Sequence, residues 1–94
     1  MEGKSVYKVP NGKLLKILLS YDEKSGSISE IKIMGDFFAY PEEAIEAMEN
    51  KLKDTLLDRA SLLEKINSVI DEYSIQFIGL NAEGLANGIL MCKK

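Results

Sequence analysis

The sequence has no histidine, no tryptophan and a single cysteine among its 94 residues. Histidine is the side chain that most often moves protons near neutral pH, and it is also a frequent metal ligand. With no histidine and one cysteine, the chain lacks the residues of a typical zinc site. The sequence also has no Gly-rich loop followed by Lys-Ser or Lys-Thr, which is the motif that would indicate phosphate binding. The residue inventory therefore argues against a complete active site within this chain.

The lone cysteine, Cys92, excludes an internal disulfide framework. A free thiol can act as a nucleophile when a neighbouring base or cation lowers its pKa. Because the chain has no histidine to do so, we expect Cys92 to be a packed thiol rather than a nucleophile.

Charge and hydropathy argue against two further classes of protein. The formal net charge of −3 does not suit a nucleic-acid-binding domain, which normally has a basic surface. No apolar run approaches the roughly 20 residues of a membrane span, and the N-terminus does not resemble a signal peptide. We therefore expect no nucleic acid, no membrane and a cytoplasmic location. With 46% hydrophobic and 29% charged residues, the chain is expected to form a single domain, residues 1–94.

Period-two patterns predict a sheet of two or three antiparallel strands, at about residues 6–9, 13–21 and 27–35. The second strand has one mixed face and one fully apolar face, and the apolar positions are Leu15, Ile17, Leu19 and Tyr21. Such a difference is expected when helices cover only one side of a sheet. A polar turn containing Gly26 joins the second and third strands as a hairpin.

Three helices are expected after the strands, at about residues 41–53, 61–73 and 81–92. Pro41 is placed at the first helical position, where proline is favoured. The S-L-L-E motif from Ser61 matches a capping box, and Asn81 is expected to cap the last helix. Gly84 and Gly88 each cost that helix about 1 kcal/mol relative to alanine, which predicts close packing against another surface. The order of elements predicts an α+β fold with the helices covering one face of the sheet.

The first candidate for a binding surface is the turn that precedes the second strand. Asn11 and Gly12 form a turn signal, since Asn-Gly readily takes positive φ. Lys13 follows at the rim of this turn, where a lysine could meet a phosphate or a carboxylate. A solvated lysine at the strand edge is the simpler interpretation.

The second candidate is the segment Gly35–Phe38. Gly35 and Asp36 form a turn in which Asp36 could orient a loop or contact a cation, or could bond its own backbone as a turn aspartate. Phe37 and Phe38 are adjacent, so in an extended chain they point to opposite faces. One core can usually bury one of them, which leaves the other for a rim, a pocket or a partner. Burial of both within the domain is the alternative.

The predicted first helix also carries four glutamates, at Glu42, Glu43, Glu46 and Glu49. Paired carboxylates can do acid/base work when burial drives their pKa values apart. On an exposed helix face they are solubilising charges, and we adopt this interpretation.

Four motifs in the first half of the chain form a specific combination, although each alone is weak. They are K-V-P-N-G-K-L-L from Lys8, Y-D-E-K-S-G-S-I from Tyr21, I-K-I-M-G-D-F-F from Ile31 and P-E-E-A-I-E-A-M-E-N-K-L from Pro41. Together they resemble the C-terminal accessory domain of lipoate–protein ligases. The resemblance covers residues 6–53, and the later helices agree with the family in order and length.

In that family a larger catalytic domain binds lipoate and ATP, makes lipoyl-adenylate and passes the lipoyl group to a lysine of an acceptor domain. The catalytic domain is absent from this sequence. The family includes split enzymes, notably archaeal ones, in which a separate small chain supplies the accessory domain, and the initial methionine is expected to fit such a stand-alone subunit. The resemblance thus implies an accessory subunit required with the catalytic subunit for ATP-dependent lipoate adenylation, and dispensable for transfer.

The resemblance also implies how partners and ligands are divided. The catalytic subunit is the expected heterodimer partner, and the lipoyl acceptor domain is an indirect one. This chain alone is expected to bind no cofactor or metal and to supply no catalytic residue, while ATP, magnesium and lipoate belong to the complex. A small domain docked over the site can order loops and exclude water from the reactive adenylate. The expected docking surface consists of Asn11, Gly12, Lys13, Gly35, Asp36, Phe37 and Phe38.

Two other functions stay open on the residues alone. One is a scaffold with a fold like that of iron–sulfur assembly proteins, although one cysteine argues against cluster binding. The other is a small homodimer that uses its open sheet face.

Overall fold

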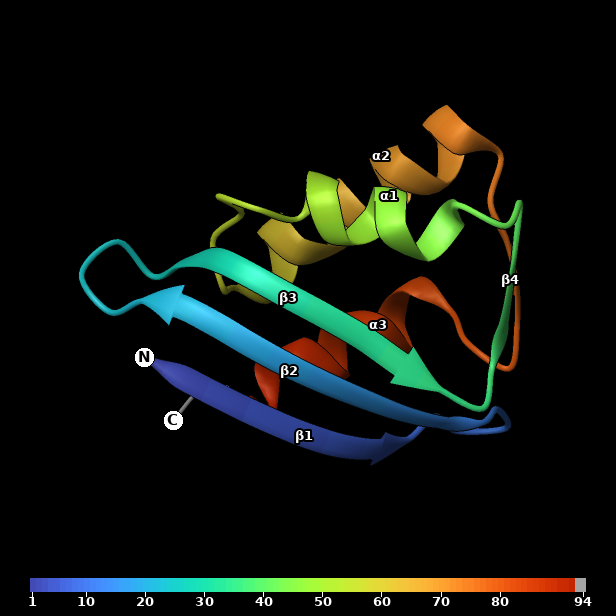
Figure 1. The fold of residues 1–94 in the computed structure, drawn as a ribbon, viewed down its shortest axis with the longest axis horizontal. Helices are drawn as coiled ribbons and strands as arrows, with labels where there is room; N and C mark the ends of the chain where they lie inside the picture. Colours follow the sequence, from blue (N-terminus) through green and yellow to red (C-terminus); the bar gives the residue numbers. More distant parts are fainter. Residues whose placement is uncertain (93–94) are drawn as a thin grey trace.

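The computed structural model describes residues 1–92, in which helices pack against one face of an antiparallel sheet (Figure 1). The elements in chain order are β1 (Glu2–Lys8), β2 (Leu14–Asp22), β3 (Ser27–Gly35), β4 (Phe38–Tyr40), α1 (Ala44–Lys51), α2 (Arg59–Tyr73), β5 (Gln76–Ile78) and α3 (Ala82–Leu90). The predicted α+β fold is confirmed. The structure adds two short strands, β4 and β5, to the predicted order.

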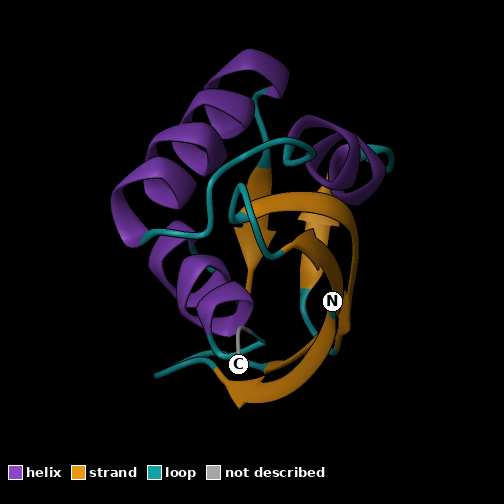
Figure 2. Cartoon of the chain, turned by 90° about the vertical axis from the view of Figure 1, so that its left-hand side faces the viewer, coloured by secondary structure: helices purple, strands orange, loops and turns teal. Residues whose placement is uncertain are grey.

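The three long strands form one sheet in the order β1-β2-β3. The four apolar positions predicted for β2 are buried, whereas Lys16 and Leu18 between them are exposed. The register shifts between Ser20 and Tyr21, so β3 accommodates one extra residue there. Such a bulge increases the local bend of a sheet, and the sheet is visibly curved around the helices (Figure 2). β1 is longer than predicted and starts at Glu2 rather than near residue 6.

The helices cover only the concave face of the sheet, as predicted. α3 packs against β1 and β2, α1 packs against β3, and α2 lies on both of these helices. A Cβ added at Gly88 would lie 2.7 Å from Cδ2 of Leu15, and one added at Gly84 would lie 2.9 Å from Cγ1 of Val9. The two glycines therefore allow α3 to approach the chain's own sheet, and this approach offsets their low helix propensity.

The start of α1 differs from the prediction. The helix begins at Ala44, not at Pro41, and the Tyr40–Pro41 peptide bond is cis. Pro41 instead occupies the turn before the helix, where its carbonyl oxygen accepts a hydrogen bond from the Ala44 N–H at 2.9 Å. The assignment of Pro41 to the first helical position is therefore wrong, and α1 ends at Lys51 rather than near residue 53.

The caps of the other two helices give one correction and one confirmation. α2 is capped by Asp58, whose Oδ1 accepts from the Ser61 N–H at 2.8 Å, so Ser61 lies inside the first turn. The predicted capping box at Ser61 is wrong because an equally good cap occurs three residues earlier. The cap of α3 is Asn81, as predicted, and its Oδ1 accepts from the Gly84 N–H at 2.6 Å. α3 ends at Leu90, two residues before the predicted end.

β4 and β5 form a separate two-stranded antiparallel ribbon at one end of the sheet (Figure 1). Phe38 lies opposite Ile78, and Tyr40 lies opposite Gln76. The predicted elements do not include this ribbon, since a three-residue strand is too short to show a period-two pattern. It connects the segment before α1 to the segment before α3.

Candidate docking surface

The turn after β1 packs directly against the segment that follows β5. The turn is closed by hydrogen bonds from the Val9 N–H to the Lys13 carbonyl at 3.1 Å and from the Gly12 N–H to the Val9 carbonyl at 2.8 Å. Asn11 takes the positive φ of 60° that its sequence predicts. The Lys13 N–H donates to the carbonyl oxygen of Gly79 at 2.8 Å, which fixes the turn next to the ribbon.

The Gly35–Asp36 turn lies beside the turn after β1. The Asp36 N–H donates to the carbonyl oxygen of Leu14, the residue after Lys13, at 3.0 Å. Gly35 has a φ of +152°, and a Cβ at this position would collide with that same oxygen, so only glycine allows this approach. The structure thus brings the two predicted segments together at one end of the molecule.

The two adjacent phenylalanines face opposite sides. Phe37 is half-buried and packs edge-to-face on Phe77, with ring centroids 6.5 Å apart and an interplanar angle of 85°. Phe38 is 61% exposed. β3 ends in the turn at Gly35, and after this turn Phe37 lies on the core side. Burial of both rings is excluded within residues 1–92.

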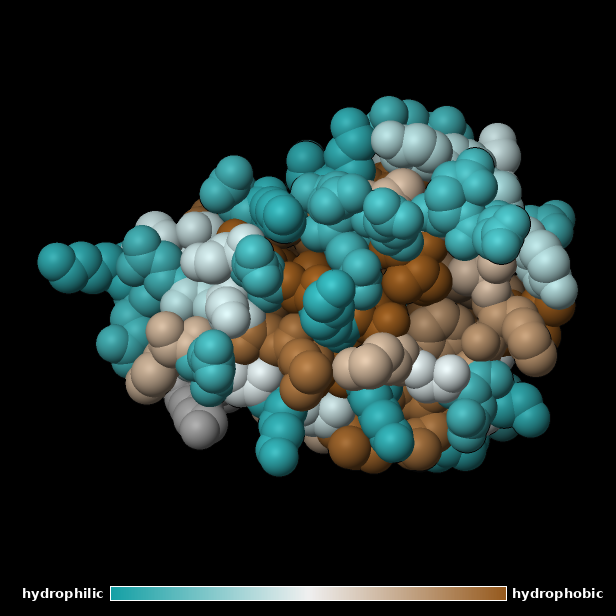
Figure 3. Space-filling model, viewed as in Figure 1, coloured by the Kyte–Doolittle hydropathy of each residue, from teal (hydrophilic) through white to brown (hydrophobic). Residues whose placement is uncertain are grey.

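Phe38 belongs to an exposed apolar surface that the sequence patterns only partly predict. Tyr40 and Ile78 share its side of the ribbon and are 53% and 55% exposed. We call these three residues the ribbon face, and apolar colours reach the surface at this end of the molecule (Figure 3). Contiguous exposed apolar side chains on one face make the ribbon face a candidate interaction site. Tyr40 and Ile78 are missed because their exposure depends on the pairing of β4 with β5.

The exposed side chains of the ribbon face are two apolar residues and one tyrosine. Within residues 1–92, no cluster of three His, Cys, Asp or Glu side chains is arranged to hold a metal. In the same range, no helix is both long enough and apolar enough to cross a bilayer. Cys92 is buried, and its Sγ lies 3.5 Å from Oγ of Ser5. Burial raises the pKa of the Cys92 thiol, an effect that the hydrogen bond to Ser5 partly opposes, so the thiol is packed and protonated at neutral pH.

One glutamate of α1 has a structural role that the prediction of a solubilising face overlooks. Oε2 of Glu49 accepts a hydrogen bond of 2.7 Å from the backbone N–H of Ile33 at the outer edge of β3. Glu42, Glu43 and Glu46 are exposed, as expected. The prediction therefore holds for three of the four glutamates and is wrong for Glu49.

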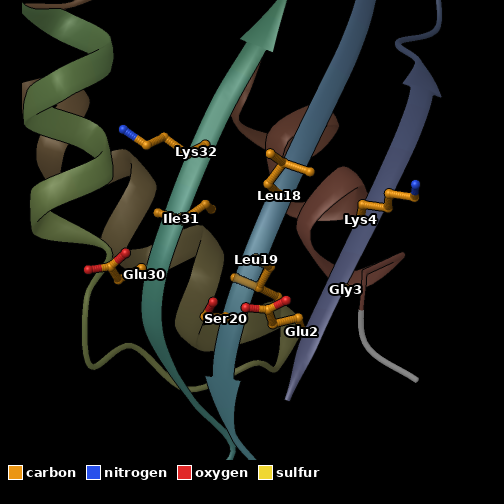
Figure 4. A pocket seen from close by; sticks show the side chains of 9 residues that line it. All are labelled: Glu2, Gly3, Lys4, Leu18, Leu19, Ser20, Glu30, Ile31 and Lys32. Carbon is orange, nitrogen blue, oxygen red and sulfur yellow. The ribbon is translucent and has the colours of Figure 1, made fainter.

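A shallow hollow of about 690 Å³ lies on the uncovered face of the sheet. Figure 4 shows Lys4 and Lys32 on either side of Leu18, with Glu2 and Glu30 towards one end. The floor of the hollow is the sheet itself, and these five side chains are exposed. Ligand pockets normally enclose most of a small molecule, so this hollow is better suited to contact with another surface.

Comparison with known proteins identifies a matching family and relatives of this chain. Residues 13–89 match the family model described as the bacterial lipoate protein ligase C-terminus. Lipoate-protein ligase A subunit 2 of Thermoplasma acidophilum is 40% identical over 60 residues, which cover 64% of this chain and 55% of the relative. The matched part thus spans about half the length of that curated relative.

A solved structure extends the likeness to almost the whole chain. It comes from a structural analysis of an archaeal lipoylation system, a bi-partite lipoate protein ligase and its E2 lipoyl domain from Thermoplasma acidophilum. The match has a TM-score of 0.71 and 26% sequence identity, and it covers 95% of this chain and 94% of the other. The helices beyond residue 53, which carry no sharp motif, are therefore part of the shared fold.

Proposed function

Because the chain belongs to the family of bacterial lipoate protein ligase C-termini, we propose that it is the accessory subunit of a bipartite lipoate–protein ligase. It acts with a catalytic subunit in the ATP-dependent adenylation of lipoate. The observation that carries this proposal is the match of 95% of this chain to 94% of a chain in the archaeal bipartite ligase structure. A domain of this family that aligns over nearly its full length with a separate chain fits a subunit.

In this proposal the two subunits divide the chemistry. The catalytic subunit holds ATP, magnesium and lipoate, and the lipoyl acceptor domain meets this chain only through that complex. The proposal is supported by the surface of residues 1–92, which presents exposed apolar side chains. The reaction consumes ATP, so the proposed location is the cytoplasm.

The proposed docking surface is the ribbon face together with the two turns beside it. A backbone hydrogen bond joins Lys13 to Gly79, and another joins Asp36 to Leu14. These bonds hold the two turns and the ribbon together as one surface. A surface that is ordered before binding loses little conformational entropy on docking. Placed over the adenylation site, it excludes water from the mixed anhydride and orders loops of the partner.

The test is a reconstituted half-reaction. The catalytic subunit is mixed with ATP, magnesium and lipoate, and pyrophosphate release is followed with and without this chain. We expect release to depend on this chain, whereas transfer from preformed lipoyl-adenylate to the acceptor domain should proceed without it. Pyrophosphate release that is the same in both mixtures would show that the adenylation role is wrong.

A further inference from the structure

The two edge strands of the sheet, β3 and β1, differ in the hydrogen bonding of their outer sides. The edge formed by β3 is partly closed, because the Ile33 N–H is bound by Glu49 and the Ile28 N–H donates to the carbonyl oxygen of Thr55 at 2.9 Å. The Asp54 N–H also donates to the carbonyl oxygen of Ile28 at 2.7 Å. The opposite edge is β1, and within residues 1–92 no other element is hydrogen-bonded to its outer side.

The register shows which backbone groups of β1 are available. The Tyr21 N–H donates to the Met1 carbonyl at 2.9 Å, and the Val9 N–H donates to the Lys13 carbonyl at 3.1 Å. In an antiparallel pair such bonded positions alternate with positions whose N–H and C=O point away. The odd-numbered residues of β1 therefore bind β2, and the outward groups belong to Glu2, Lys4, Val6 and Lys8.

The outward positions are self-complementary in one antiparallel register. When Glu2 lies opposite Lys8 of a second copy, Lys4 lies opposite Val6, and the two-fold axis passes through Ser5. A shift by two residues in either direction places Lys4 opposite Lys4 or Lys4 opposite Lys8, and like charges directly opposite each other are destabilising. Of these three registers, only the first has opposite charges at both ends and no like-charge pair.

We propose that β1 pairs antiparallel with β1 of a second copy of this chain in that register. All seven residues of β1 then have a partner, and four outward positions that each exchange two hydrogen bonds give about eight backbone hydrogen bonds. Val6, which is 60% exposed, packs against the aliphatic stem of Lys4 from the other copy. The two sheets join into one continuous sheet, which removes both open edges.

This dimer is compatible with the proposed function and independent of it. β4 and β5 lie at the end of the sheet where β1 ends (Figure 1). The two-fold axis places the two ribbon faces at opposite ends of the dimer. Each copy can therefore bind its own catalytic subunit, and the resulting assembly has two chains of each kind.

The test is the oligomeric state of the full chain, measured by sedimentation velocity from about 10 µM to about 1 mM. We expect a concentration-dependent dimer that Glu2→Lys weakens at least tenfold, because that change places two lysines opposite each other. Adding Lys8→Glu to Glu2→Lys should restore the dimer. Glu30→Lys is the matched control, since it makes the same charge change on β3, away from the β1 edge.

A second variant tests the backbone contacts directly. Val6→Pro removes an outward N–H and leaves the bonds to β2 intact, so it should abolish the dimer while circular dichroism shows a folded protein. A wild-type monomer at the highest concentration, or a dimer that neither Glu2→Lys nor Val6→Pro weakens, would overturn the proposal. Failure of the charge swap to restore association would refute this register. If the chain stays monomeric and Val6→Pro instead prevents binding of the catalytic subunit, the edge belongs to that partner and self-pairing is wrong.

Discussion

The adjacent pair Phe37 and Phe38 offers a test in which two changes of the same size should have opposite effects. We expect Phe38→Ala to weaken binding to the catalytic subunit and to leave the stability of the free chain almost unchanged. Phe37→Ala should lower the stability of the free chain and leave its binding to the catalytic subunit almost unchanged. The difference arises because Phe38 is 61% exposed, while Phe37 packs on Phe77 with ring centroids 6.5 Å apart.

The magnitude follows from the exposed fraction. Full burial of a phenylalanine side chain contributes about 1.5–3 kcal/mol. The 61% of Phe38 that is exposed in the free chain can therefore contribute about 1–2 kcal/mol on docking. This corresponds to a dissociation constant raised about 5- to 30-fold by Phe38→Ala. Phe37→Ala should instead lower the free energy of unfolding by about 2–3 kcal/mol, because it removes a half-buried ring and its aromatic contact.

Two measurements on the same variants decide between these outcomes. Isothermal titration calorimetry against the catalytic subunit gives the dissociation constant, and urea unfolding of the free chain gives its stability. Ile78→Ala is a useful companion, since Ile78 lies opposite Phe38 and is 55% exposed. If Phe38→Ala and Ile78→Ala both retain wild-type affinity, the ribbon face is not the docking surface.

Three further predictions concern the stability of the free chain, measured by urea unfolding. Glu49→Ala should lower the free energy of unfolding by about 1–2 kcal/mol, because the Ile33 N–H loses its charged acceptor; Glu46→Ala, at an exposed position of the same helix, should change it by less than about 0.5 kcal/mol. The Thr55 hydroxyl is buried without a hydrogen-bond partner within residues 1–92, so Thr55→Val should raise the free energy of unfolding by about 1 kcal/mol; a loss would show that the hydroxyl is satisfied. Burial raises the pKa of the Cys92 thiol above its ordinary value of 9.0, and the hydrogen bond to Ser5 lowers it in part. The unfolded chain therefore loses this proton first, and stability should fall as pH rises above about 9, an effect that Cys92→Ala should remove.

The sequence predicts the sheet well because its signals are local and repeated. Alternation in β2 identifies the buried face, and Asn81 identifies the start of α3. Local signals fail where two candidates compete, as at Asp58 and Ser61, which are three residues apart and equally good caps. They also fail at Pro41, because a cis peptide bond before a helix cannot be inferred from the propensity of proline for a first turn.

The two segments of the candidate surface were predictable from the sequence, whereas their meeting in the fold was not. The Asn-Gly turn and the Gly-Asp-Phe-Phe segment are irregular in sequence, so each can be singled out alone. Their meeting depends on the long-range hydrogen bonds from Lys13 to Gly79 and from Asp36 to Leu14, which no local pattern contains. Tyr40 and Ile78 are exposed because β4 pairs with β5, which places Tyr40 opposite Gln76 and Phe38 opposite Ile78, and only the structure shows that pairing.

The contact between β1 and α3 has a consequence for the order of folding. Oγ of Ser5 donates to the carbonyl oxygen of Gly88 at 2.7 Å, across 83 positions of the chain. The inner side of the first strand is therefore covered only after the last helix has left the ribosome. Contacts of such long range slow folding and leave apolar surface uncovered during synthesis. A nascent chain that stops before α3 should expose the sheet to chaperones, so the last helix to be made completes the fold.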